Sequence, residues 1–126
     1  MDKTTVDTFE KLVAQFDGLH SEIGSLGRKS PNDALNNFKL TLVNNLIISA
    51  NKLLGVKYKP FSDFEKFDGE NIPSNSDVTF ILAQYISCFE KFRSDNIKML
   101  YDASWYWVID IDGSRIPTSP PRKIKG

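Results

Sequence analysis

The residues that most often perform catalysis or bind metals are scarce in this sequence, which contains one histidine, His20, and one cysteine, Cys88. A zinc or iron site here would consist almost wholly of carboxylates. His20 falls on an apolar stripe and is predicted to be a partly buried structural residue, and Cys88 directly precedes Phe89 and is predicted to be a core thiol. We therefore expect no catalytic residue, no metal and no cofactor, although spacing does not decide whether His20 meets a serine or cysteine of another element.

The motifs for calcium and for nucleotide phosphates are incomplete. The acidic run 63–69 has Phe67 where a calcium loop needs an oxygen ligand, and Asp68 where it needs glycine. The glycines at 18, 24 and 27 fall in or beside a predicted helix with no strand before them, so they do not form a phosphate loop. Calcium binding and nucleotide-dependent catalysis are unsupported.

An aromatic cluster near the C-terminus is the first candidate for recognition. Tyrosine and tryptophan are frequent in interfaces and in ligand pockets because they offer a large rigid area with one polar group. One interpretation places Trp105 and Trp107 against the helices and leaves Tyr106 exposed. The alternative is a small-molecule pocket between helices and hairpin. Its predicted lining is Tyr85, Tyr101, Trp105 and Trp107.

The C-terminal tail, 119–126, is the second candidate. Pro120 and Pro121 precede the basic residues Arg122 and Lys123, a spacing found in polyproline ligands of aromatic grooves. A spacer or a strap laid over the fold explains the prolines equally well. The few basic charges here support only weak, salt-sensitive phosphate contact.

Asn37, Asn44 and Asn51 recur at intervals of seven and so share one ridge of a predicted helix. Asparagine is a weak helix former that competes for backbone hydrogen bonds, so its abundance here needs a reason. A solvated face or caps for a neighbouring loop would explain it. The other interpretation is a polar seam that fixes the register of a helical partner.

Three helices are predicted to position these residues. The stretch 4–26 repeats apolar residues at spacings of three and four. Asp2 or Thr4 can cap its start, and Gly24 and Gly27 are predicted to mark its end.

The second helix is predicted from Pro31 to about Leu54, with Ser30 as N-cap and Gly55 as its stop. Its apolar residues cover more than one face, so we expect it to be the central helix. The connection that follows, 56–75, contains Pro and Gly and is acidic, with phenylalanines predicted to pin it to the core.

The third helix is predicted to begin near 74–76 and to continue toward Leu100. The segment 104–111 is aromatic and β-branched, which is typical of a strand. An Asp-Gly turn at 112–113 then leads to a short return strand, 114–118.

The composition favours one soluble domain, 1–118, followed by the tail. The 126 residues are 40% hydrophobic, and 16 Lys and Arg balance 16 Asp and Glu. This balance gives no global reason to bind nucleic acid or an anionic membrane. The chain begins with a polar stretch, no run is long enough to span a membrane, and a lone cysteine suits a reducing compartment, so we expect a cytoplasmic protein.

The predicted fold class is mainly α (α+β): a three-helix antiparallel bundle with a short acidic aromatic connection and a C-terminal β-hairpin. The function that this composition favours is a non-catalytic accessory or interaction protein, which binds a protein partner or itself. The small-molecule-binding helical domain remains the alternative.

Overall fold

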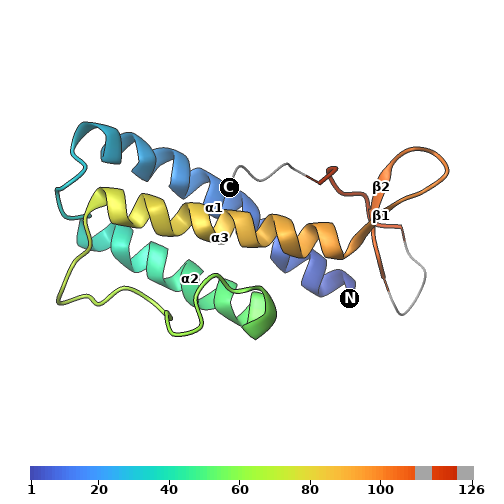
Figure 1. Cartoon of the computed structure of the whole chain (residues 1–126), viewed down its shortest axis with the longest axis horizontal. Coiled ribbons are helices and arrows are strands. Elements are labelled where there is room, and N and C mark those ends of the chain that lie inside the picture. Colours follow the sequence, from blue (N-terminus) through green and yellow to red (C-terminus); the bar gives the residue numbers. More distant parts are fainter. Residues whose placement is uncertain (110–114, 122–126) are drawn as a thin grey trace.

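A computed structural model of the chain describes residues 1–109 and 115–121. Figure 1 shows an elongated helical bundle with a small hairpin at one end, which confirms the predicted mainly-α bundle with a C-terminal hairpin. The elements are α1 (Lys3–Lys29), α2 (Asn37–Tyr58), α3 (Asn75–Asp95), β1 (Ile97–Met99) and β2 (Trp105–Trp107).

The directions of the helices differ from a wholly antiparallel bundle. α1 runs antiparallel to the other two, but α2 and α3 run in the same direction (Figure 1). Asn51 bonds to Tyr85 and, further along both helices, Tyr58 bonds to Asp95. The parallel arrangement arises because the connection 59–74 returns along the bundle before α3 begins.

Two glycines that were predicted to end the first helix lie inside α1. Asp2 caps the start as predicted, since its side chain accepts a 2.8 Å hydrogen bond from the Thr5 amide. The helix continues through Gly24 and Gly27 because both face α3. A Cβ at Gly27 would lie only 3.2 Å from Oγ1 of Thr79, so the missing side chain lets α1 and α3 approach closely.

The predicted start of the second helix is wrong. α2 begins at Asn37, and the N-cap is Asn36, whose Oδ1 accepts a 2.8 Å hydrogen bond from the Lys39 amide. Ser30, which the Ser-Pro signal proposed as this cap, is instead the C-cap of α1. Its amide donates to the carbonyl of Leu26 at 2.7 Å.

The loop between α1 and α2 pairs with the segment that precedes α3. The Leu35 amide donates to the Pro73 carbonyl at 3.0 Å, and the Asn75 amide donates to the Asp33 carbonyl at 2.8 Å. These backbone bonds tie the loop to residues 73–75, so its groups are not available to extend α2 toward the N-terminus. A long-range pairing of this kind has no local sequence signal.

The hairpin is built from a different pair of strands than predicted. α3 ends at Asp95 instead of continuing toward Leu100, and β1 pairs antiparallel with β2, with Ile97 opposite Trp107. The short apolar run after α3 fits a helix or a strand by periodicity alone. The segment becomes strand β1 because it pairs with the aromatic strand β2.

The predicted return segment does pair with the aromatic strand, on the other side of β2, through an antiparallel bridge between Tyr106 and Pro117. The Trp107 amide donates to the Ile116 carbonyl at 2.9 Å, and the Thr118 amide donates to the Trp105 carbonyl at 3.1 Å. β2 is therefore flanked on both sides in the described residues. The predicted Asp-Gly turn at 112–113 lies outside them.

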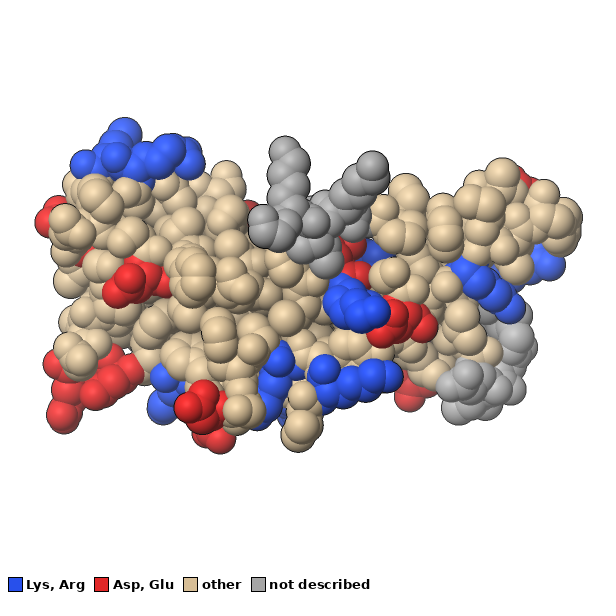
Figure 2. Space-filling view, in the orientation of Figure 1, with Lys and Arg blue, Asp and Glu red and all other residues tan. Residues whose placement is uncertain are grey.

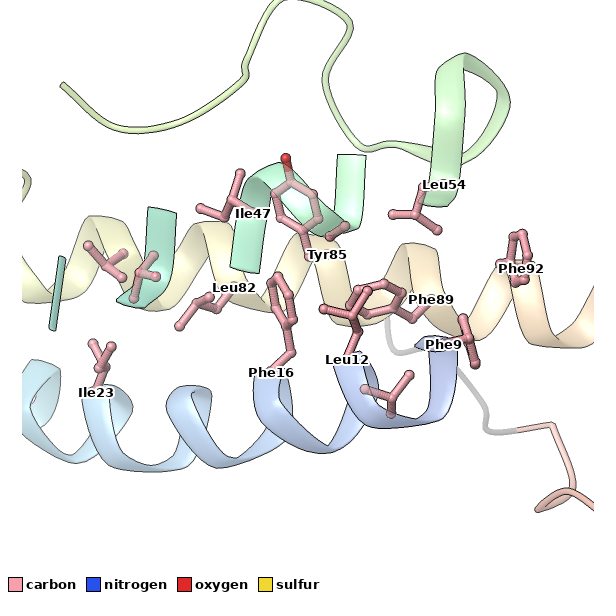
Figure 3. Close-up of a cluster of buried hydrophobic side chains, with 14 of the residues drawn as sticks. Phe9, Leu12, Phe16, Ile23, Ile47, Leu54, Leu82, Tyr85, Phe89 and Phe92 are labelled. Atoms are coloured by element: carbon pink, nitrogen blue, oxygen red, sulfur yellow. The ribbon is translucent and has the colours of Figure 1, made fainter. Parts of the chain in front are cut away.

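The core fills the seam where α1, α2 and α3 meet (Figure 3). Phe16 of α1 stacks its ring edge on Phe89 of α3 with centroids 5.0 Å apart, and Phe9 does the same at 5.6 Å. Such edge-to-face pairs add to the stabilisation from burial alone. The phenylalanine-rich seam thus fixes α1 on α3.

Candidate functional site

Two of the aromatic candidates are buried structural residues. Trp107 is 1% exposed and packs its ring 5.2 Å from that of Phe9. Tyr85 is fully buried beside Phe16, two helical turns of α1 away from Phe9 (Figure 3). Its hydroxyl donates a 2.6 Å hydrogen bond to Oδ1 of Asn51, and burial raises the pKa of Tyr85 to about 12.

The other aromatic candidates lie on or near the hairpin surface. Tyr101 at the hairpin loop is 88% exposed, with the Arg115 guanidinium 5.5 Å from its ring centroid. Tyr106 is half-buried, and its hydroxyl donates to Asp102 at 2.7 Å, which raises the pKa of Tyr106 and lowers that of Asp102. Trp105 is also half-buried. The structure does not gather these residues and Tyr85 around one point.

Two of the three ridge asparagines hold the acidic connection onto α2. Asn44 makes a paired contact with the backbone of Phe67, in which its Nδ2 donates at 3.0 Å and its Oδ1 accepts at 2.9 Å. Nδ2 of Asn51 donates to the carbonyls of Phe64 and Glu65 at 3.2 and 3.3 Å. Asn37 is exposed at the start of α2. The amides of Asn44 and Asn51 are thus engaged within the chain.

A buried arginine joins the C-terminal segment to the bundle. Arg93 is 2% exposed, and its Nη1 donates at 2.5 Å both to Oε1 of Glu10 and to Oγ1 of Thr118. Its guanidinium lies 5.1 Å from the ring centroid of Phe9 and 5.4 Å from that of Trp107. Its Nε lies 3.5 Å from the buried carboxylate of Glu90. Opposite charge and aromatic faces therefore surround the buried cation, and the contact positions residues near 118 across α1 and α3.

The histidine and the cysteine occupy separate places. His20 borders a cleft of about 440 Å³, which is lined also by Arg28, Ser76 and Thr79. Cys88 is half-buried against the core, and burial raises the pKa of its thiol. Within residues 1–109 and 115–121, no three metal-ligating side chains come together.

The cleft beside His20 lies near the start of α3, but the backbone there is already satisfied. The Ser76 amide donates to the Pro31 carbonyl at 3.1 Å, and the amides of Asp77 and Val78 donate to Ser74 at 3.2 and 3.1 Å. An anion site at a helix start depends on free backbone N–H groups. This cleft therefore lacks the donors that such a site uses.

The outer face of α2 carries exposed apolar residues, although the sequence pattern predicted that this helix would lie in the interior. α2 contacts both α1 and α3, but it is not the central helix that was expected, because the most extensive helix pair is α1 with α3. α2 instead presents Phe38 at 74% exposure, Leu42 at 41% and Val56 at 89% to the surface. The sequence shows that α2 has apolar residues on more than one face. In the structure, some of these residues form an exposed surface and not a buried contact.

A groove between α1 and α2 runs beside this face. Its first part is an apolar cleft of about 340 Å³, in which Leu19 of α1 faces Leu42 and Leu46 of α2. Its second part is a cleft of about 440 Å³ with hydroxyl groups from both helices. The second cleft is lined by Thr4, Thr5, Thr8, Ser49, Lys52 and Leu53.

Charges on the face shown in Figure 2 occur in small groups of both signs, without one dominant patch. The tail candidates Arg122 and Lys123 lie outside the described residues. In the part of the chain that the structure describes, no helix has an apolar stretch long enough to cross a bilayer. No protein-family model, curated protein or solved structure matches this chain.

Proposed function

We propose that this protein is a non-catalytic accessory or interaction protein, which binds a protein partner or a second copy of itself through its helix faces and C-terminal hairpin. A cytoplasmic location belongs to the same proposal, since the single cysteine suits a reducing compartment. The observation that carries the proposal is the uncovered apolar face of α2.

The energetics of that face support binding. Burying one large apolar side chain is worth about 1.5–3 kcal/mol relative to leaving it exposed. Phe38 and Leu42 are one turn apart on the same side of α2, and Leu42 lines the apolar cleft together with Leu46. Neighbouring exposed apolar side chains beside an apolar cleft are typical of a surface that another molecule covers.

The hairpin supplies a second exposed apolar group at the far end of the molecule. Met99 is 53% exposed and Tyr101 is 88% exposed, and Val108 lies just beyond β2 at 36%. Tyrosine is enriched among the residues that dominate binding energy in interfaces. The hairpin is therefore included in the proposed binding surface.

The first experiment is the solution mass of the purified protein by light scattering over a concentration series. It decides whether the partner is a second copy. A photo-crosslinking amino acid is then placed at Leu42, and in a matched variant at Phe80, which is 59% exposed on the outer side of α3. Both variants are expressed in the protein's native cells.

The expected result is a discrete protein adduct at position 42 that is absent at position 80. Equal, diffuse labelling at both positions would contradict a binding role for the α2 face. Turnover of a substrate by the isolated protein would contradict the non-catalytic assignment.

A further inference from the structure

We infer that the groove between α1 and α2 accepts one amphipathic helix of a different protein, and that the polar side of this helix is acidic. The inference rests on the proposed interaction function and specifies the partner's chemistry. Three properties of the groove carry it: its shape, the spacing of its two clefts and its charge.

The shape suits a helix. α1 and α2 run antiparallel side by side, and the Lys39 ammonium reaches Glu22 across them at 3.6 Å. α3 packs on the other side of this pair through core residues such as Val43 and Ile47, and no segment within residues 1–109 and 115–121 covers the groove side. A fourth helix laid there would complete a four-helix arrangement by the usual packing of side-chain ridges into grooves.

The spacing of the clefts fits one helical repeat. Leu42 and Leu46 line the apolar cleft, and Ser49 and Leu53 line the hydroxyl-rich one, each seven residues further along α2. Seven residues of α-helix span about 10.5 Å. A partner helix along the groove therefore places residue i in one cleft and residue i+7 in the other, with a large apolar side chain facing Leu19.

The charge of the groove selects an acidic partner. Lys52 of α2 lines the second cleft, and α2 has no Asp or Glu, whereas Lys39 is already paired with Glu22 of α1. Lys11 of α1 is exposed and lies within one helical turn of both Thr8 and Gln15, which line the two clefts. A carboxylate at position i+7 of the partner would meet the hydroxyls and the Lys52 ammonium of the second cleft.

The same charges disfavour a second copy in this groove. Two copies joined through their α2 faces would bring the lysines of one α2 against those of the other. Like charges juxtaposed in an interface cost several kcal/mol. The groove therefore favours a heterologous acidic helix over self-association through this face.

The test uses two synthetic helical peptides of 18 residues as probes. The first has leucine at positions i and i+4, glutamate at i+7 and glutamates along its polar side, and the second has lysine in place of every glutamate. Each is titrated into the full-length ¹⁵N-labelled protein up to millimolar concentration. We expect the acidic peptide to shift the amide resonances of groove residues, with Leu19, Leu46 and Thr8 among them.

Charge reversal provides the matched control. Lys52→Glu is expected to weaken binding of the acidic peptide about tenfold and to strengthen binding of the lysine peptide. Phe80→Ser, on the outer side of α3, is expected to leave both affinities unchanged.

Three results would overturn the inference: equal binding of both peptides, shifts confined to another face, or no shifts at millimolar acidic peptide. A dimer that occupies the groove would also overturn it. In each case a specific adduct at position 42 would leave the interaction function standing, so the two failures are distinguishable.

Discussion

The hydrogen bond between Tyr85 and Asn51 is predicted to couple the core to the acidic connection. Oδ1 of Asn51 accepts from the buried Tyr85 hydroxyl at 2.6 Å, while Nδ2 of the same amide holds the carbonyls of Phe64 and Glu65. One side chain of α2 thus links α3 to a segment without regular structure. Removing either partner tests whether these bonds act together.

The magnitude follows from what each variant leaves behind. Tyr85→Phe removes one hydrogen bond and is expected to lower the free energy of unfolding by about 1 kcal/mol. Asn51→Ala removes the same bond and both connection bonds, and it leaves the Tyr85 hydroxyl buried without its acceptor, for a cost of about 2–4 kcal/mol. The double variant has no Tyr85 hydroxyl that could be left without its acceptor. Its loss in the free energy of unfolding should therefore be about 1–2 kcal/mol smaller than the sum of the two single losses.

The pH dependence gives a second readout. Burial raises the pKa of Tyr85 from 10.0 to about 12, so the folded state holds the proton more tightly than the unfolded state. The associated stability is fully present below pH 10 and is lost as pH rises toward 12, by an amount on the order of 2–3 kcal/mol. The Tyr85→Phe variant has no hydroxyl to ionise and so does not lose this stability. The difference in the free energy of unfolding between the parent and this variant should therefore close or reverse above pH 10.

Urea unfolding followed by circular dichroism at pH 7 and at pH 11 measures all four proteins of the cycle. Strict additivity of the two substitutions at pH 7 would refute the claimed coupling. A stability gap that stays constant from pH 7 to pH 11 would refute the role of Tyr85 ionisation.

The remaining predictions concern the Arg93 contact, the helix glycines and the thiol. Arg93→Met is expected to lower the free energy of unfolding by about 3–5 kcal/mol, because it removes the cation that lies 3.5 Å from the buried carboxylate of Glu90; urea unfolding measures this, and a loss under 1 kcal/mol would contradict it. Gly18→Ala should stabilise α1 by about 0.8–1 kcal/mol in thermal unfolding, since its Cβ meets nothing within 4 Å, whereas Gly27→Ala should gain clearly less because its Cβ lies 3.2 Å from Thr79; equal gains would exclude the close approach of α1 and α3. Cys88 should react with a thiol reagent at pH 8 more slowly than a free cysteine and at the free rate after unfolding, because burial raises its pKa; equal rates would show that the thiol is accessible.

Local patterns predicted the helices well where the signal and the tertiary contacts agree. The spacing of apolar residues in α1 and the Asp2 cap follow from sequence, because both depend on neighbours within one or two turns. The Ser30-Pro31 signal failed because the Ser30 and Pro31 carbonyls accept hydrogen bonds from Asn75 and Ser76 in the first turn of α3, more than forty residues away. A local rule carries no information about such a contact.

The candidate site was only partly predictable for the same reason. The seven-residue spacing of Asn44 and Asn51 was visible in the sequence, but their acceptors at Phe64 and Phe67 depend on the return path of the connection. The apolar residues of α2 were visible too. The sequence pattern does not say which of its sides the chain itself covers.

The position of the connection explains why the open side of α2 lies where it does. The amides of Asn44 and Asn51 fix the connection along one side of α2, while Val43 and Ile47 face the bundle core. Among the described residues, the side that carries Phe38 and Leu42 receives no covering segment. Substituting Phe38 by a polar residue should therefore affect binding more than folding, because this residue is 74% exposed in the free protein and is buried only when a partner is present.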